Sequence, residues 1–195
     1  MMQHLALTVR GFLAAGVVLI GAMGLAGTTA AQQFGYSPLI EAIMDSNLYN
    51  LRAALLSGVN PNTKKADGTP AIVLAAGQSK YPQEMVQLLL QQDARPAEQD
   101  RKGNTALVVA TRREHRGLIN VLLYFKADPD IPGESGEVPL MIAIKNNNVE
   151  ILQMLIDSGA DINATDYTGR TPLAIAQEGR NRNIVEMVEA AGGYL

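Results

Sequence analysis

The sequence predicts an all-α fold: a solenoid of about five helix-turn-helix units with β-hairpin-like loops, preceded by a signal peptide. Three observations support this fold class. A short motif recurs with a period of roughly 33 residues, which is typical of stacked supersecondary units. Each copy is followed by two apolar clusters at helical spacing. The first forty residues have a composition that the rest of the chain does not share.

The N-terminal segment has the three parts of a secretory signal peptide. Residues 1–40 contain Arg10 and His4 but no acidic residue, an apolar run spans residues 12–26, and small residues follow as far as Ala31. Signal peptidase requires small side chains at the cut, so we expect residues 1–31 to be removed and the protein to be periplasmic or secreted. An uncleaved membrane anchor is the alternative, although this run is shorter than the ~20 residues that span a bilayer.

The recurring motif opens with a hydroxyl residue in four of its five copies, usually followed by Pro. The copies begin at Ser37-Pro-Leu, Thr69-Pro-Ala, Thr105-Ala-Leu, Val138-Pro-Leu and Thr171-Pro-Leu. Successive copies are 32, 36, 33 and 33 residues apart. We therefore assign residues 32–195 to one repeat domain, with repeats at about 35–66, 67–100, 101–133, 134–166 and 167–195.

The fourth copy indicates how one unit folds. Pro139 suits the first turn of a helix, where its missing N–H costs nothing. Asn residues at 146–148 favour a turn, and a second helix from Val149 to Ser158 ends at Gly159, which provides a left-handed residue. Two such short helices cannot bury their apolar faces alone, so the units must stack on their neighbours.

The residue that opens each copy is a candidate helix cap. Ser37, Thr69, Thr105 and Thr171 each have a hydroxyl that can accept a hydrogen bond from the first turn of the helix. Val138 has none, so Val138→Thr is expected to stabilise the fold by about 1 kcal/mol. The first helices also share an alanine at one offset (Ala42, Ala110, Ala143 and Ala176), which predicts that these helices approach one another closely.

Two stretches carry a resemblance to a known family: Gly169-Arg-Thr-Pro-Leu-Ala-Ile-Ala176 and Leu155-Ile-Asp-Ser-Gly-Ala-Asp-Ile-Asn163. Together with the spacing of the copies, they are similar to the ankyrin repeat, and the resemblance covers about five units from Ser37 to the C-terminus. It implies a short curved stack that binds other proteins through its hairpin tips and the inner face of its first helices. The resemblance also implies a protein that is not an enzyme.

The chain departs from the family's pattern in three places. No unit has the family's His after the Thr-Pro-Leu opening. The second unit has extra residues around 77–81, between its helices, and its leading hairpin is one residue short. Lys126 replaces the glycine that would end the second helix of the third unit, so we expect that unit to be weaker there.

Composition argues against catalysis and cofactor binding. The chain has no cysteine, which excludes disulfides, zinc–thiolate sites and thiol nucleophiles, and it has only two histidines, His4 and His115. His115 falls between the two helices of the third unit, where we expect its side chain to stabilise the turn that joins them. No phosphate loop, nucleophile elbow or metal-ligand spacing occurs, so we predict no catalytic residue, no metal, no cofactor and no small-molecule substrate.

The resemblance also implies where a partner would bind. Hairpin tips and the inner face, mapped by offset, hold a basic stretch in repeats two and three and mixed charges beyond it. The candidate partner-binding residues are Lys64, Lys65, Arg101, Lys102, Asn104, Arg112, Arg113, Glu134, Glu137, Lys145, Tyr167 and Arg170, with Glu178 on the same surface. The net charge is -3, so nucleic acid is a poor candidate, and we expect a protein partner with an acidic patch and a monomeric chain.

These observations lead to one functional prediction. The chain is expected to be a non-catalytic protein–protein interaction module of the bacterial periplasm. Two alternatives remain open: a secreted effector that binds a host protein, and a scaffold held to the membrane by an uncleaved N-terminal helix.

Overall fold

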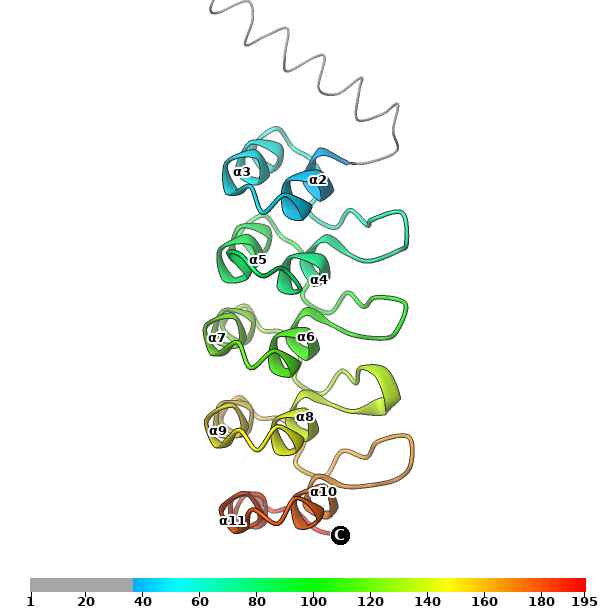
Figure 1. The fold of residues 1–195 in the computed structure, drawn as a ribbon, viewed down its shortest axis with the longest axis vertical. Helices are drawn as coiled ribbons and strands as arrows, with labels where there is room; N and C mark the ends of the chain where they lie inside the picture. The colour runs from blue at the N-terminus through cyan, green and yellow to red at the C-terminus, as the bar shows by residue number, and fades with distance from the viewer. Residues whose placement is uncertain (1–36) are drawn as a thin grey trace, which may run out of the picture.

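The computed structural model describes residues 37–195. The predicted signal peptide, residues 1–31, and its cleavage near Ala31 lie outside the described residues. Within residues 37–195 the chain forms ten α-helices in five consecutive pairs, which stack into two columns (Figure 1). We call α2, α4, α6, α8 and α10 the inner column, because the long loops project on their side, and α3, α5, α7, α9 and α11 the outer column.

The helices are short and regularly spaced. In the inner column they are α2 (Pro38–Met44), α4 (Ala71–Ala76), α6 (Ala106–Arg112), α8 (Pro139–Lys145) and α10 (Pro172–Glu178). In the outer column they are α3 (Leu48–Leu56), α5 (Pro82–Leu90), α7 (Arg116–Tyr124), α9 (Val149–Asp157) and α11 (Arg182–Ala190). Four loops join the pairs: 57–70, 91–105, 125–138, which contains the 3-10 turn η1 (Glu134–Gly136), and 158–171.

The fold class predicted from the sequence is confirmed. Among the described residues the only β-type pairing outside helices is an isolated antiparallel bridge between Lys64 and Pro70. Each later loop is closed by one backbone hydrogen bond of similar register, such as Asp100 N to Asn104 O at 3.0 Å and Asp166 N to Arg170 O at 3.1 Å. The loops therefore turn back as hairpins without forming a sheet.

Hydroxyl caps begin three of the inner helices, as predicted. Ser37 accepts a hydrogen bond from Leu39 N at 3.3 Å. Thr105 accepts one from Val108 N at 3.2 Å, and Thr171 accepts one from Ala174 N at 3.3 Å. α8 has no side-chain cap at Val138, which is also as predicted.

The prediction that Thr69 caps its helix is wrong. α4 begins one residue later than its counterparts, at Ala71, and Pro70 occupies the cap position without a side-chain hydrogen bond. The loop 57–70 is as long as the loops 125–138 and 158–171, so the expectation of a hairpin one residue short is wrong as well. The closing hydrogen bond runs from Lys65 N to Thr69 O, at 2.9 Å, as Asp100 N bonds Asn104 O, so Thr69 takes the place before the cap. Thr69 is thereby part of the loop, where its N–H donates to Asp67 Oδ1 at 2.9 Å.

The core lies between the columns and between successive repeats. Ala110 and Ala143 are fully buried, and Ala42 and Ala176 are at most 2% exposed, in agreement with the predicted close approach of the inner helices. His115 is the cap of α7, where its Nδ1 accepts a hydrogen bond from Leu118 N at 3.2 Å. Lys126 has the left-handed φ of 61° that the sequence predicted for the glycine position.

Candidate functional site

The predicted partner-binding residues lie on the loops beside the inner column and at the ends of its helices. Most lie on the loops, and three lie at the ends of inner helices: Arg112 and Arg113 at α6, and Lys145 at α8. We call the loops 57–70, 91–105, 125–138 and 158–171, together with the exposed ends of the inner helices, the inner surface. Its side chains are held by two sets of contacts, one within each repeat and one between repeats.

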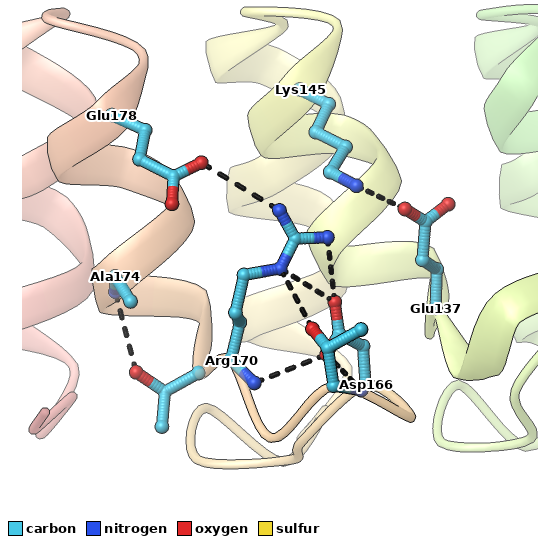
Figure 2. A network of polar contacts seen from close by, with 8 residues as sticks. Glu137, Lys145, Asp166, Arg170, Ala174 and Glu178 are labelled. Atoms are coloured by element: carbon cyan, nitrogen blue, oxygen red, sulfur yellow. Dashed lines mark hydrogen bonds and ion pairs between the residues drawn. The ribbon is translucent and has the colours of Figure 1, made fainter.

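Within each of the last three repeats, the residue before the helix cap contacts the end of the same helix. In repeat four, Lys145 Nζ forms an ion pair with Glu137 (Figure 2). In repeat five the charges of the two positions are exchanged, and Arg170 Nη1 lies 3.7 Å from Glu178 Oε2. In repeat three, Arg112 donates to the neutral amide oxygen of Asn104 at 3.1 Å. This last pair is therefore the one without a carboxylate.

Asp166 organises the charges of the fifth repeat. Its buried carboxylate accepts hydrogen bonds from Thr168 N at 2.9 Å and Arg170 N at 3.0 Å, and Arg170 Nη2 pairs with it at 2.8 Å (Figure 2). Burial raises the pKa of Asp166, but the hydrogen bonds from Thr168 and Arg170 outweigh burial and hold that pKa well below its usual range. Asp166 in turn raises the pKa of Arg170, which fixes its guanidinium as a cation.

Contacts between repeats hold neighbouring loops together. Lys64 forms an ion pair with Glu98 at 2.8 Å, and Lys102 forms one with Glu134 at 3.4 Å. The oxygen of the buried Asn104 also accepts the backbone N–H of Glu134, at 3.3 Å. The positive charges of Lys64 and Lys102 are thus already matched by carboxylates of the next loop.

Local contacts account for two more of the predicted residues. Lys65 pairs with Asp67 at 2.9 Å in the same loop, and the bond to Lys65 is the first cause of a pKa of Asp67 well below its usual range. Tyr167 is exposed, with its backbone N–H donating to Ser135 O at 3.3 Å and its ring against Gly136. Gly136 has a φ of +79° and leaves no room for a Cβ beside this ring.

Three cations of the predicted partner-binding set have no carboxylate partner among the described residues: Arg101, Arg112 and Arg113. All three are exposed. Elsewhere in residues 37–195 the lack of a carboxylate partner also holds for Arg52, Lys80, Lys126 and Arg180. Arg101 reaches the neighbouring loop, where its side chain lies over Gly68, and a Cβ added to Gly68 would be 3.2 Å from Arg101 Nε. Of the basic side chains predicted in repeats two and three, only these three arginines therefore have a positive charge that no carboxylate of the described residues matches.

Sequence reasoning missed the carboxylates Asp67, Glu98 and Asp166, which pair with the predicted cations, and it also missed Asp100. Asp100 accepts hydrogen bonds from Lys102 N and Asn104 N, both at 2.9 Å, and thereby shapes its loop as Asp166 shapes the last one. A signal for Glu98 was present, since it follows Lys64 by about one repeat period and such residues lie side by side in stacked units.

The larger hollows of the described surface lie on the outer column, away from the predicted residues. One is lined by α5, α7 and α9, including Tyr124, Phe125 and Met154, and another lies between α3 and α5. No three His, Asp or Glu side chains in residues 37–195 are placed to hold a metal ion. In the same residues, no helix is both long and apolar enough to cross a membrane.

A family model described as ankyrin repeats (3 copies) matches residues 30–132 and, in a second match, residues 116–191. Together the two matches cover most of the chain. The chain belongs to the ankyrin repeat family. Ankyrin repeats are general modules of protein–protein interaction, and the family is typically non-enzymatic. No curated protein matches the chain. The inner surface defined above is therefore that of an ankyrin stack, and its three arginines without a carboxylate partner in residues 37–195 lie in the third repeat.

Proposed function

We propose that this ankyrin stack binds another protein through its inner surface and that it does so as a non-catalytic module of the bacterial periplasm. The observation that carries the proposal is the group of exposed arginines, Arg101, Arg112 and Arg113, which have no carboxylate partner among residues 37–195 although the chain has a net charge of -3. Unpaired cations on a surface of this kind favour a partner with an acidic patch, and association with it weakens as salt is added.

Mutation of two of these arginines tests the binding surface. Arg101→Glu combined with Arg112→Glu reverses the charge of exposed side chains, so the variant is expected to fold and to lose capture of the partner from a periplasmic extract. Its melting temperature should fall only by the loss of the Arg112–Asn104 hydrogen bond and of the cation at the end of α6. Arg52→Glu, on the exposed face of α3 in the outer column, is the matched control and is expected to capture the partner normally. Capture that survives the double change would reject the inner surface as the binding site.

The location of the protein is a separate part of the proposal. Its support is the sequence of residues 1–31, with a basic start, an apolar run and small residues before Ala31. Mass spectrometry of the mature N-terminus is expected to find a chain that begins at or next to Gln32, in the periplasmic fraction. Recovery from the culture supernatant would favour a secreted effector, and a membrane-bound chain that retains residues 1–31 would favour an anchored scaffold.

The non-catalytic part of the proposal rests on the place of His115. This imidazole is used at Nδ1 to cap α7, and we expect it to act in folding only. We also propose that the chain is monomeric and needs no cofactor or small-molecule substrate. A turnover that disappears in His115→Ala, measured at a temperature at which the variant is still folded, would overturn the non-catalytic part.

A further inference from the structure

The third repeat breaks a pattern of internal charge compensation. In repeats four and five the ion pairs Glu137–Lys145, Arg170–Glu178 and Arg170–Asp166 match two cations with three carboxylates (Figure 2). The corresponding pair of repeat three is Asn104 with Arg112. A neutral amide stands where repeat four has Glu137, so the positive charge of Arg112 is held in place without being neutralised.

Arg112 is positioned to accept a second partner. Its Nη1 donates to Asn104 Oδ1, and Asn104 is itself only 4% exposed and fixed by Asp100 through Nδ2 at 3.2 Å. A guanidinium has five N–H donors, so most of the donors of Arg112 are left over by this single contact. Because the side chain is already tethered, less conformational entropy is lost when an anion binds.

The acidic groups around Arg112 are engaged elsewhere. Asp100 accepts hydrogen bonds from Lys102 N, Asn104 N and Asn104 Nδ2. The carboxylate of Glu114 accepts Asn148 Nδ2 at 2.7 Å. Neither forms an ion pair with an arginine among residues 37–195. The N–H donors of Arg112 that the bond to Asn104 leaves over, and the exposed side chain of Arg113, therefore have no carboxylate partner in residues 37–195.

We propose that Arg112, with Arg113 and Arg101, binds carboxylate side chains in an acidic segment of the partner protein, whereas the cations of repeats four and five do not. This inference rests on the proposed function and names the chemical group of the partner that the inner surface binds. Carboxylates match the planar fork of a guanidinium, which can donate two parallel hydrogen bonds to one of them. The paired Lys145 and Arg170 would have to exchange one carboxylate for another, with no gain in charge compensation.

A different role for Arg112 is purely local. It lies in the last turn of α6, where a cation interacts favourably with the carbonyl end of a helix. That role predicts an effect of its replacement on stability and none on binding of an anion. Binding and melting temperature are therefore measured on the same variants.

The test uses a fluorescein-labelled hexaglutamate peptide and fluorescence anisotropy with the purified protein. Arg112→Gln is expected to weaken binding of the peptide by about fivefold or more. Arg52→Gln, the same change of charge on the outer column, is expected to change it by less than about twofold, because screening weakens distant charges. Glu137→Gln is expected to strengthen binding, since it releases Lys145, whereas Glu189→Gln, on the exposed face of α11, should not.

Three results would overturn the inference. The first is that the peptide does not bind at a protein concentration of about 1 mM, where a weak electrostatic contact is still measurable. The second is that Arg112→Gln and Arg52→Gln weaken binding of the peptide equally. The third is that inorganic phosphate displaces the peptide at equal ionic strength. The proposed function fails separately. If the peptide does not bind but Tyr167→Ala abolishes capture of the partner, the inner surface binds a protein by another chemistry.

Discussion

Single side chains determine where each inner helix of this stack begins. Thr105 caps α6 although it is buried, whereas Val138 occupies the same place before α8 and is 3% exposed. A cap adds a hydrogen bond to an otherwise unpaired N–H, but a threonine at position 138 would also exchange a buried methyl group for a hydroxyl. The stabilisation expected from the sequence alone is therefore reduced by this burial.

The two positions can be compared directly by mutation. Thr105→Val is expected to lower the free energy of unfolding by about 1–2 kcal/mol, because it removes an existing cap. Val138→Thr is expected to raise it by about 0.5 kcal/mol, the part of the cap energy that remains after the lost apolar contact. Urea titration of both variants measures these changes. A stabilising Thr105→Val would mean that burial outweighs capping in this fold.

The carboxylate of Asp166 is expected to make the stability depend on pH. Its pKa in the folded protein lies below the value of about 3.9 for an unfolded chain, so the charged form stabilises the fold above pH 4. This contribution is lost progressively as the pH falls from about 4 toward the folded pKa. Asp166→Asn removes hydrogen bonds to a charged group and should cost about 2 kcal/mol at pH 7.

The pH dependence gives the measurement. The difference in unfolding free energy between Asp166→Asn and the wild type should shrink as the pH is lowered from 7 toward about 2, because protonation removes the same charge from the wild type. Unfolding in urea at several pH values measures it. A difference that stays constant over this range would show that the variant acts by a change of packing alone.

At the scale of helices and loops, the sequence predicted what depends on local pattern. The repeat period, the prolines of the first turns and the hydroxyl caps each act within one unit, and the helix pairs form where they were expected. Thr69 was mispredicted because its Thr-Pro pair is shifted by one residue within the repeat, so that Pro70 and not Thr69 stands at the cap position. The spacing of 32 residues is visible in the sequence, but whether the loop shortens or the helix begins one residue later depends on contacts across that loop.

The charge pairs of the inner surface were harder to predict because they join different repeats. Lys64 with Glu98 and Lys102 with Glu134 are each separated by about one period, and Arg116 with Glu150 is a third case on the outer column. Opposite charges at this separation are candidates for pairs in any stack of repeats. Sequence offsets alone placed these residues on a common surface but did not tell which of them were already compensated.

The packing of the inner column predicts a strong effect at one alanine. Ala143 in α8 is fully buried, and α6 and α10 pack on either side of α8. Ala143→Leu adds volume where the helices are close, so it is expected to destabilise the fold by about 1–3 kcal/mol. Thermal melting measures the change. Ala190→Leu, at an exposed position of α11, is the control and should stay within about 0.5 kcal/mol of the wild type; an unchanged melting curve for Ala143→Leu would refute the close packing.

At the scale of the whole molecule, each repeat contacts only its neighbours, so stability is expected to vary along the stack. α8 buries six of its seven residues, whereas α11, at the C-terminal end, buries only Ile184 and Val188 out of nine. In such an arrangement an end repeat can open after losing one interface, but a central repeat must lose two. The fifth repeat should therefore open more often than the fourth.

Hydrogen exchange of the backbone amides tests this gradient under native conditions. Amides of α8 are expected to exchange through global unfolding, whereas those of α11 should exchange through a local opening that costs less free energy. Ala143→Leu should then speed exchange in α8 and in its neighbours. Protection that is equal in α8 and α11 would mean that the stack unfolds as a single cooperative unit, because the interface between repeats would then be strong enough to suppress opening at the end.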